Sequence, residues 1–65
     1  MNYPKTLASR ITRAGRYVSL SRYPISGYYE ITRETADEYG TYYARTIYDT
    51  GREAWAAYKR NGEKN

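Results

Sequence analysis

The stretch RYVSLSRYPISGYYEITR, residues 16–33, decides the fold that the sequence predicts. Apolar and polar side chains alternate over residues 17–23, with Val18 and Leu20 on one face. This period of two is typical of a half-buried β-strand. Pro24 cannot donate a hydrogen bond to a strand ladder, so the segment that begins there is expected to be a turn. The alternation resumes after that turn over residues 28–33, with Tyr29 and Ile31 on one face, so the whole stretch predicts a β-hairpin.

A third strand is predicted at residues 41–48, where β-branched and aromatic side chains are densest. The alternation leaves two options for its inward face, which are Tyr43 with Ile47, or Tyr42 with Ala44 and Tyr48. The first option places Arg45 inside the protein, where an unpaired charge is costly. The second option avoids that cost but leaves Ile47 outside. The sequence does not decide between them.

A helix that packs on the sheet is predicted at residues 50–61. Asp49 or Thr50 can accept hydrogen bonds from the free amides of its first turn, and Glu53 follows Thr50 by three residues, as in a capping box. Three alanines favour the helix, and Lys59 and Arg60 lie in its last turn, where the helix dipole favours cations. Trp55 is predicted to be a core residue on the face that packs against the sheet.

The first 15 residues are predicted to form a short helix or an extended arm. Pro4 suits the first helical position, and Leu7, Ala8 and Ile11 share one face at helical spacing, which favours the helix. The stretch at 9–13 has the competing character of a strand. A solvated loop is expected at 34–40 and a frayed tail at 62–65.

The fold class predicted from these segments is α+β, in a single small domain. We expect an N-terminal helix or arm, a three-stranded antiparallel sheet over residues 16–48, and a C-terminal helix over residues 50–61.

Composition argues against an enzyme. The 65 residues include no histidine and no cysteine, which removes the commonest general base, thiolate metal sites and disulfides. Carboxylates at positions 34, 37 and 38 fall in the expected loop, where water would solvate them. We therefore predict no catalytic residues, no metal site and no cofactor. No apolar run is long enough to cross a membrane, and a cytoplasmic location is expected.

Charge is distributed unevenly along the chain. Residues 1–33 carry six basic and one acidic side chain, a net +5, whereas residues 34–65 carry five basic and six acidic ones, a net −1. We call residues 1–33 the basic front. A segment with this excess of positive charge suits an anionic partner. The candidate partner-binding residues are Arg10, Arg13, Arg16, Arg22, Tyr17 and Tyr28.

Two kinds of partner fit these side chains. Tyrosine, tryptophan and arginine dominate protein interfaces, and the chain has 19 of them, which favours a protein partner. Arginine and tyrosine also build grooves for single-stranded nucleic acid, which is the alternative, with Tyr17, Tyr23 and Tyr28 as the stacking platform. A free sheet edge would also permit a homodimer.

In size and plan the chain resembles small phage-encoded accessory proteins, a group that includes anti-CRISPR inhibitors of host defence. The resemblance covers the hairpin, the third strand and the helix that begins at DTGREAW, residues 49–55. It implies a stoichiometric inhibitor that covers the surface of a protein or of a protein–nucleic-acid complex. No functional residue follows from it. The net charge of +4 argues against mimicry of DNA.

Overall fold

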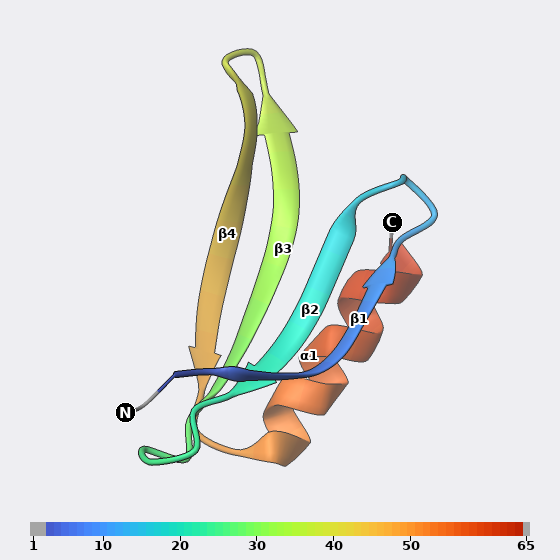
Figure 1. The fold of residues 1–65 in the computed structure, drawn as a ribbon. Helices are drawn as coiled ribbons and strands as arrows, with labels where there is room; N and C mark the ends of the chain where they lie inside the picture. The colour runs from blue at the N-terminus through green and yellow to red at the C-terminus, as the bar shows by residue number, and fades with distance from the viewer. Residues whose placement is uncertain (1–2, 65) are drawn as a thin grey trace.

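The protein is a four-stranded antiparallel sheet with one helix on one of its faces (Figure 1). The computed structural model describes residues 3–64. The strands lie in the order β1-β2-β3-β4. The elements are β1 (Lys5–Ile11), β2 (Tyr17–Arg22), β3 (Tyr29–Asp37), β4 (Gly40–Tyr48) and α1 (Gly51–Lys64). The α+β class is therefore correct, whereas the prediction of three strands is wrong.

The predicted N-terminal helix is absent, and its place is taken by β1. This strand pairs with β2 along its length, with Ala8 opposite Leu20. The apolar residues that suggested a helical face, Leu7 and Ile11, remain 42% and 64% exposed. Pairing satisfies the backbone groups that β1 and β2 direct toward each other, and this long-range gain overrides the weak helical pattern.

The predicted loop at residues 34–40 is also wrong, because β3 continues to Asp37 and β4 begins at Gly40. Only two residues connect the strands, and an Asp37 carboxylate oxygen accepts a hydrogen bond from the backbone N–H of Tyr39 at 2.8 Å. Gly40 has a φ of +128°, which favours glycine. A segment without large aliphatic residues resembles a loop in sequence, but cross-strand pairing holds it as a hairpin. This hairpin extends beyond the helix-covered part of the sheet (Figure 1).

The buried core lies between the sheet and α1. Its members are Val18, Leu20 and Ile31 from the sheet and Ala54, Ala57 and Tyr58 from the helix. The predicted facing of the first two hairpin strands is thus confirmed. We call the sheet surface that packs on α1 the helix face and the opposite surface the open face.

The facing of β4 follows the second option. Ala44 and Tyr48 are half-buried, and Tyr48 packs against the core, whereas Ile47 is 53% exposed. Arg45 therefore lies on the open face, where its Nε is 3.7 Å from a carboxylate oxygen of Glu30. The Arg45 charge has an acidic partner there and its side chain stays exposed, which explains why this option costs less than burying it.

Helix α1 begins as predicted but ends later. The Thr50 hydroxyl oxygen accepts a hydrogen bond from the backbone N–H of Glu53 at 3.3 Å, so Thr50 is the N-cap. The helix continues to Lys64, and the frayed tail predicted at 62–65 is wrong for 62–64. Asn65 lies outside the described residues.

Trp55 is not a core residue. The buried positions Ala54, Ala57 and Tyr58 follow the i, i+3, i+4 spacing of one helix face, and Trp55 lies beside that stripe. Its side chain is 45% exposed. It contacts the edge of the core through Tyr58, with the ring centroids 5.8 Å apart in an edge-to-face arrangement.

Truncation of Leu20 and of Trp55 should therefore differ in effect. Leu20 is fully buried, so Leu20→Ala is expected to cost about 2–5 kcal/mol and to unfold much of the protein at room temperature. Trp55→Ala should cost roughly 1–2 kcal/mol and keep a cooperative transition. Urea denaturation followed by circular dichroism measures both. If Trp55→Ala were unfolded while Leu20→Ala remained stable, the assignment of Leu20 to the core and of Trp55 to its edge would be contradicted.

Candidate functional site

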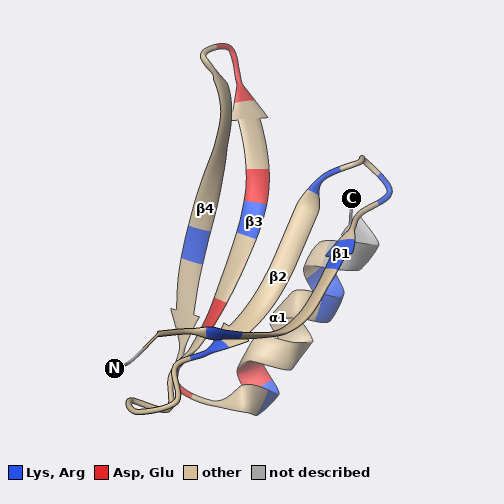
Figure 2. Cartoon of the chain, viewed as in Figure 1, with Lys and Arg blue, Asp and Glu red and all other residues tan. Residues whose placement is uncertain are grey.

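Five cations gather at one end of the molecule, which we call the basic end. They come from the β1–β2 turn, from β3 and from the C-terminal half of α1, and they are Arg13, Arg16, Arg33, Lys59 and Arg60. Figure 2 shows the β1–β2 turn and the C-terminal half of α1 on the same side of the molecule, with β3 farther toward β4, whereas the acidic turn of the β3–β4 hairpin points away from the first two. All five side chains are exposed except that of Arg16, which is half-buried.

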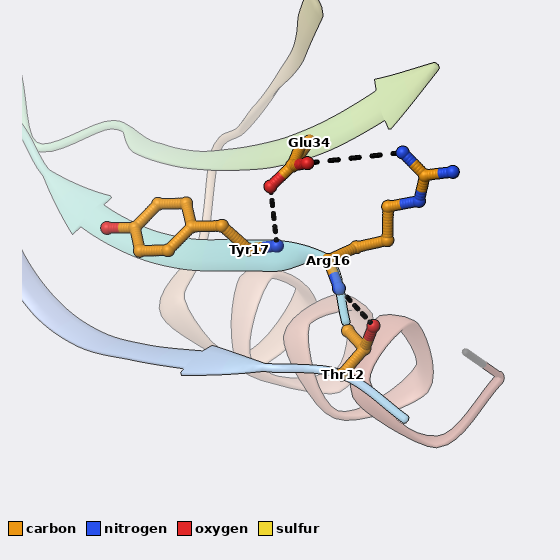
Figure 3. Close-up of polar contacts among 4 residues, drawn as sticks. All are labelled: Thr12, Arg16, Tyr17 and Glu34. Carbon is orange, nitrogen blue, oxygen red and sulfur yellow. Dashed lines mark hydrogen bonds and ion pairs between the residues drawn. The ribbon is translucent and has the colours of Figure 1, made fainter. Parts of the chain in front are cut away.

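A polar cavity of about 240 Å³ lies within the basic end. It is lined by Thr12, Arg16, Tyr17, Val18, Arg33, Glu34, Thr35, Ala36 and Asn61. The turn on one side of it is rigidly bonded, since the backbone N–H of Arg16 donates to the Thr12 hydroxyl oxygen at 3.2 Å (Figure 3). Gly15 in the same turn has a φ of +78°, a left-handed conformation that favours glycine.

Glu34 is already engaged at the rim of this cavity. One carboxylate oxygen accepts a hydrogen bond from the backbone N–H of Tyr17 at 3.2 Å, and the other lies 4.0 Å from the Arg16 guanidinium (Figure 3). Glu34 therefore ties β3 to the start of β2 and offsets one positive charge. Among the described residues, Arg33 has no acidic partner. The basic end thus retains an excess of positive charge.

Arg10, a predicted partner-binding residue, has a structural role instead. Its guanidinium Nη2 donates to the backbone carbonyls of Tyr58 at 2.9 Å and of Lys59 at 3.2 Å. The same guanidinium lies 4.6 Å from the centre of the Tyr58 ring. These contacts attach β1 to α1, although Arg10 and Tyr58 are 48 positions apart in the sequence. They also hold Lys59 at the basic end.

The remaining candidates do not form one surface. Arg13 and Arg16 belong to the basic end, but Arg22 lies at the opposite end of β2, over the ring of Tyr29 at 5.9 Å. Tyr28 is 47% exposed near that same end, where it lines a second hollow with Tyr23, Ser26 and Ile47. The predicted basic front is therefore divided, and Arg22 and Tyr28 lie away from the basic end.

The open face does not provide the continuous stacking platform expected for a nucleic-acid groove. Tyr17 is half-buried at the start of β2 and Tyr23 follows its end, with Ser19 and Ser21 between them. Cross-strand register places the carboxylate residue Glu30 opposite Ser21. Rings at the two ends of the face are thus separated by small hydroxyl side chains, with acids nearby that repel phosphates.

Lys59, Arg60 and Arg33 were missed by sequence reasoning. The two helix residues were interpreted only as favourable charges in a last helical turn. No local signal shows that they approach the β1–β2 turn, because only the packing of α1 across the sheet brings them there. Arg33 was counted as a basic residue but not as a site residue.

No group of three or more potential metal-ligating side chains occurs among residues 3–64 as far as they are described. In that same part of the chain, no helix has the length and apolar character that a membrane crossing requires. No family model, no curated protein and no solved structure matches the chain. The resemblance to phage-encoded inhibitors therefore stays a prediction.

Glu30 changes the acid–base behaviour of Tyr23. The Tyr23 hydroxyl donates a 2.8 Å hydrogen bond to a Glu30 carboxylate oxygen. This bond, together with burial and the charge of Glu30, raises the pKa of Tyr23 above its ordinary value of 10.0, and Arg45 partly opposes the change. Because the folded-state pKa is raised, the contact stabilises the protein below pH 10.0, and its contribution is lost as the pH rises through the folded-state pKa.

An NMR titration of ring-labelled tyrosine should show Tyr23 ionising above pH 10.0. In Glu30→Gln the acceptor is neutral, so the Tyr23 midpoint should fall toward the ordinary value. Tyr23→Phe identifies the signal. A midpoint that is the same in wild type and Glu30→Gln would contradict the assigned cause.

Arg10→Ala should weaken the attachment of α1. The variant loses two hydrogen bonds and a cation–π contact, and we expect a loss of about 1 kcal/mol in unfolding free energy. Arg13→Ala is the matched control, because Arg13 is exposed and its stability effect should be within about 0.5 kcal/mol of zero. Thermal unfolding of both variants measures the difference, and equal melting temperatures would contradict the assigned role of Arg10.

Proposed function

We propose that the protein is a small non-catalytic binding protein that docks on an acidic surface of a protein partner through its basic end. The observation that carries this proposal is the gathering of five cations from three separate segments at the basic end, where Arg16 and Arg33 line the cavity together with the single acid Glu34. Such a surface attracts a negatively charged partner and orients it before contact.

The nature of the groups on the surface supports a protein partner over a single nucleic-acid strand. A strand needs cations for its phosphates together with neighbouring rings on which its bases stack. Here Tyr17 and Tyr23 lie at the two ends of β2 on the open face, and Glu30 and Glu34 belong to the same face. Arginine at a protein interface needs only a facing carboxylate, and the planar guanidinium binds it through paired hydrogen bonds.

The protein would act by occupying its partner's surface, without chemistry of its own. A domain of 65 residues has a small core, so a partner that binds only the folded chain also stabilises it. Binding is expected to be stoichiometric, with charges at the rim of the interface setting the association rate.

The test is affinity capture with the tagged chain from a nuclease-treated lysate of its native cells, compared with the triple variant Arg13→Ala, Lys59→Ala, Arg60→Ala. All three side chains are exposed, so the variant should fold normally. We expect a stoichiometric protein that is captured by wild type and lost, or reduced at least roughly tenfold, with the triple variant. Arg52→Ala, at the other end of α1, is the control and should capture as wild type does.

A titration with mixed-sequence single-stranded DNA tests the alternative of a nucleic-acid partner. We expect no detectable binding at physiological salt. If wild type binds this DNA with micromolar affinity, and the salt dependence of that affinity is weaker in the triple variant, the partner is a nucleic acid and not a protein. Capture that disappears after nuclease treatment, or that is the same for wild type and the triple variant, would contradict docking of a protein at the basic end.

A further inference from the structure

The two edges of the sheet differ in how well they are protected against pairing. Edge strand β1 carries Lys5 and Arg10, and its register with β2 shifts between Thr6 and Ala8. Charges and irregularities of this kind discourage another strand from adding to an edge. The other edge strand, β4, has nine residues in unbroken register with β3, contains no proline and carries a single charge, Arg45. It has the features of an edge that pairs with another strand.

From this difference we infer that two copies of the chain associate by antiparallel pairing of β4 with β4 about a two-fold axis at Ala44. Figure 1 shows β4 as the outer strand of the sheet, with no element beyond it. The inferred dimer is an eight-stranded sheet in which both helices lie on the same face. It does not depend on the proposed function, because it rests on the backbone of β4 and not on the cations of the basic end, of which Arg33 is the one that lies opposite Ala44 in the β3–β4 register.

Backbone geometry limits the possible registers. Along β4, alternate residues direct their N–H and C=O groups toward β3, and the others direct them outward. Outward-directed residues of one copy must face outward-directed residues of the other, so paired residue numbers must have the same parity. Only two-fold axes that pass through a residue satisfy this condition. The axis at Ala44, the middle residue of Gly40–Tyr48, is the one that pairs all nine residues.

Side chains favour the same axis. With the axis at Ala44, Arg45 lies opposite Tyr43 of the other copy on the open face, and a cation beside an aromatic ring is favourable. With the axis at Arg45, the two arginines would face each other directly, which is unfavourable. With the axis at Tyr43, the overlap of the two strands shortens by two residues.

Single cysteines test the register directly, because the chain contains no cysteine of its own. In Ala44→Cys the two copies place their Cα atoms about 5.5 Å apart or closer, which suits a disulfide. In Thr46→Cys and Tyr42→Cys the equivalent atoms are offset by four residues, roughly 14 Å, which is too far. Under mild oxidation, Ala44→Cys should form a covalent dimer at least tenfold faster than the other two variants.

Analytical ultracentrifugation of the full chain measures the association itself. Tyr43→Lys puts a second cation opposite Arg45 in both symmetric pairs and should weaken dimerisation roughly tenfold or more. Tyr43 is 57% exposed, so the variant should fold. Ile11→Lys, which changes an exposed residue of β1, is the matched control and should dimerise as wild type does. A wild-type chain that is monomeric at NMR concentrations would overturn the inference. So would cross-linking that is fastest at a position other than 44, or an Ile11→Lys variant whose dimer is weakened as much as that of Tyr43→Lys.

Discussion

The close packing of two alanines on the sheet is the interaction on which the rest of the structure depends. The chain has only seven isoleucine, leucine and valine residues, and three of them are buried against the helix. The side chains of Ala54 and Ala57 are too small to hold α1 away from β2 and β3. The few apolar side chains between the helix and the sheet therefore still form a closed core. A larger residue at either position would move the helix away from Leu20. Every other feature of the molecule is placed by this contact.

The same contact creates the charged surface. Cations in the β1–β2 turn and in the C-terminal half of α1 are more than forty residues apart in sequence, and they meet because α1 lies across the sheet. The guanidinium of Arg10 secures that meeting by binding carbonyls of the helix. One arginine is therefore used for structure so that its neighbours can face solvent. The cations without an acidic partner among the described residues are the ones to which the proposed acidic partner would bind.

A small core also leaves much apolar and aromatic surface uncovered. Four of the seven large aliphatic residues, including Ile11 and Ile47, are exposed. The open face can keep apolar side chains exposed because its carboxylates have partners within the chain. Glu30 contacts Tyr23 and Arg45, and Glu34 accepts a hydrogen bond from β2. The β4 edge lacks such protection. Pairing with a second copy would satisfy its outward backbone groups, and it would leave the basic end free.

Local patterns in the sequence determined the central hairpin, the inward faces of β2 and β3, and the start of the helix at Thr50, because alternation and capping depend on adjacent residues. The strand character of β1, the length of the β3–β4 hairpin and the exposure of Trp55 were decided only by the tertiary structure. Each depends on whether a distant strand or helix supplies backbone partners or cover, which neighbouring residues do not reveal. The basic end belongs to the second group. Its arginines are evident in the sequence, but the approach of the helix cations to the β1–β2 turn results from the packing of α1 on the sheet.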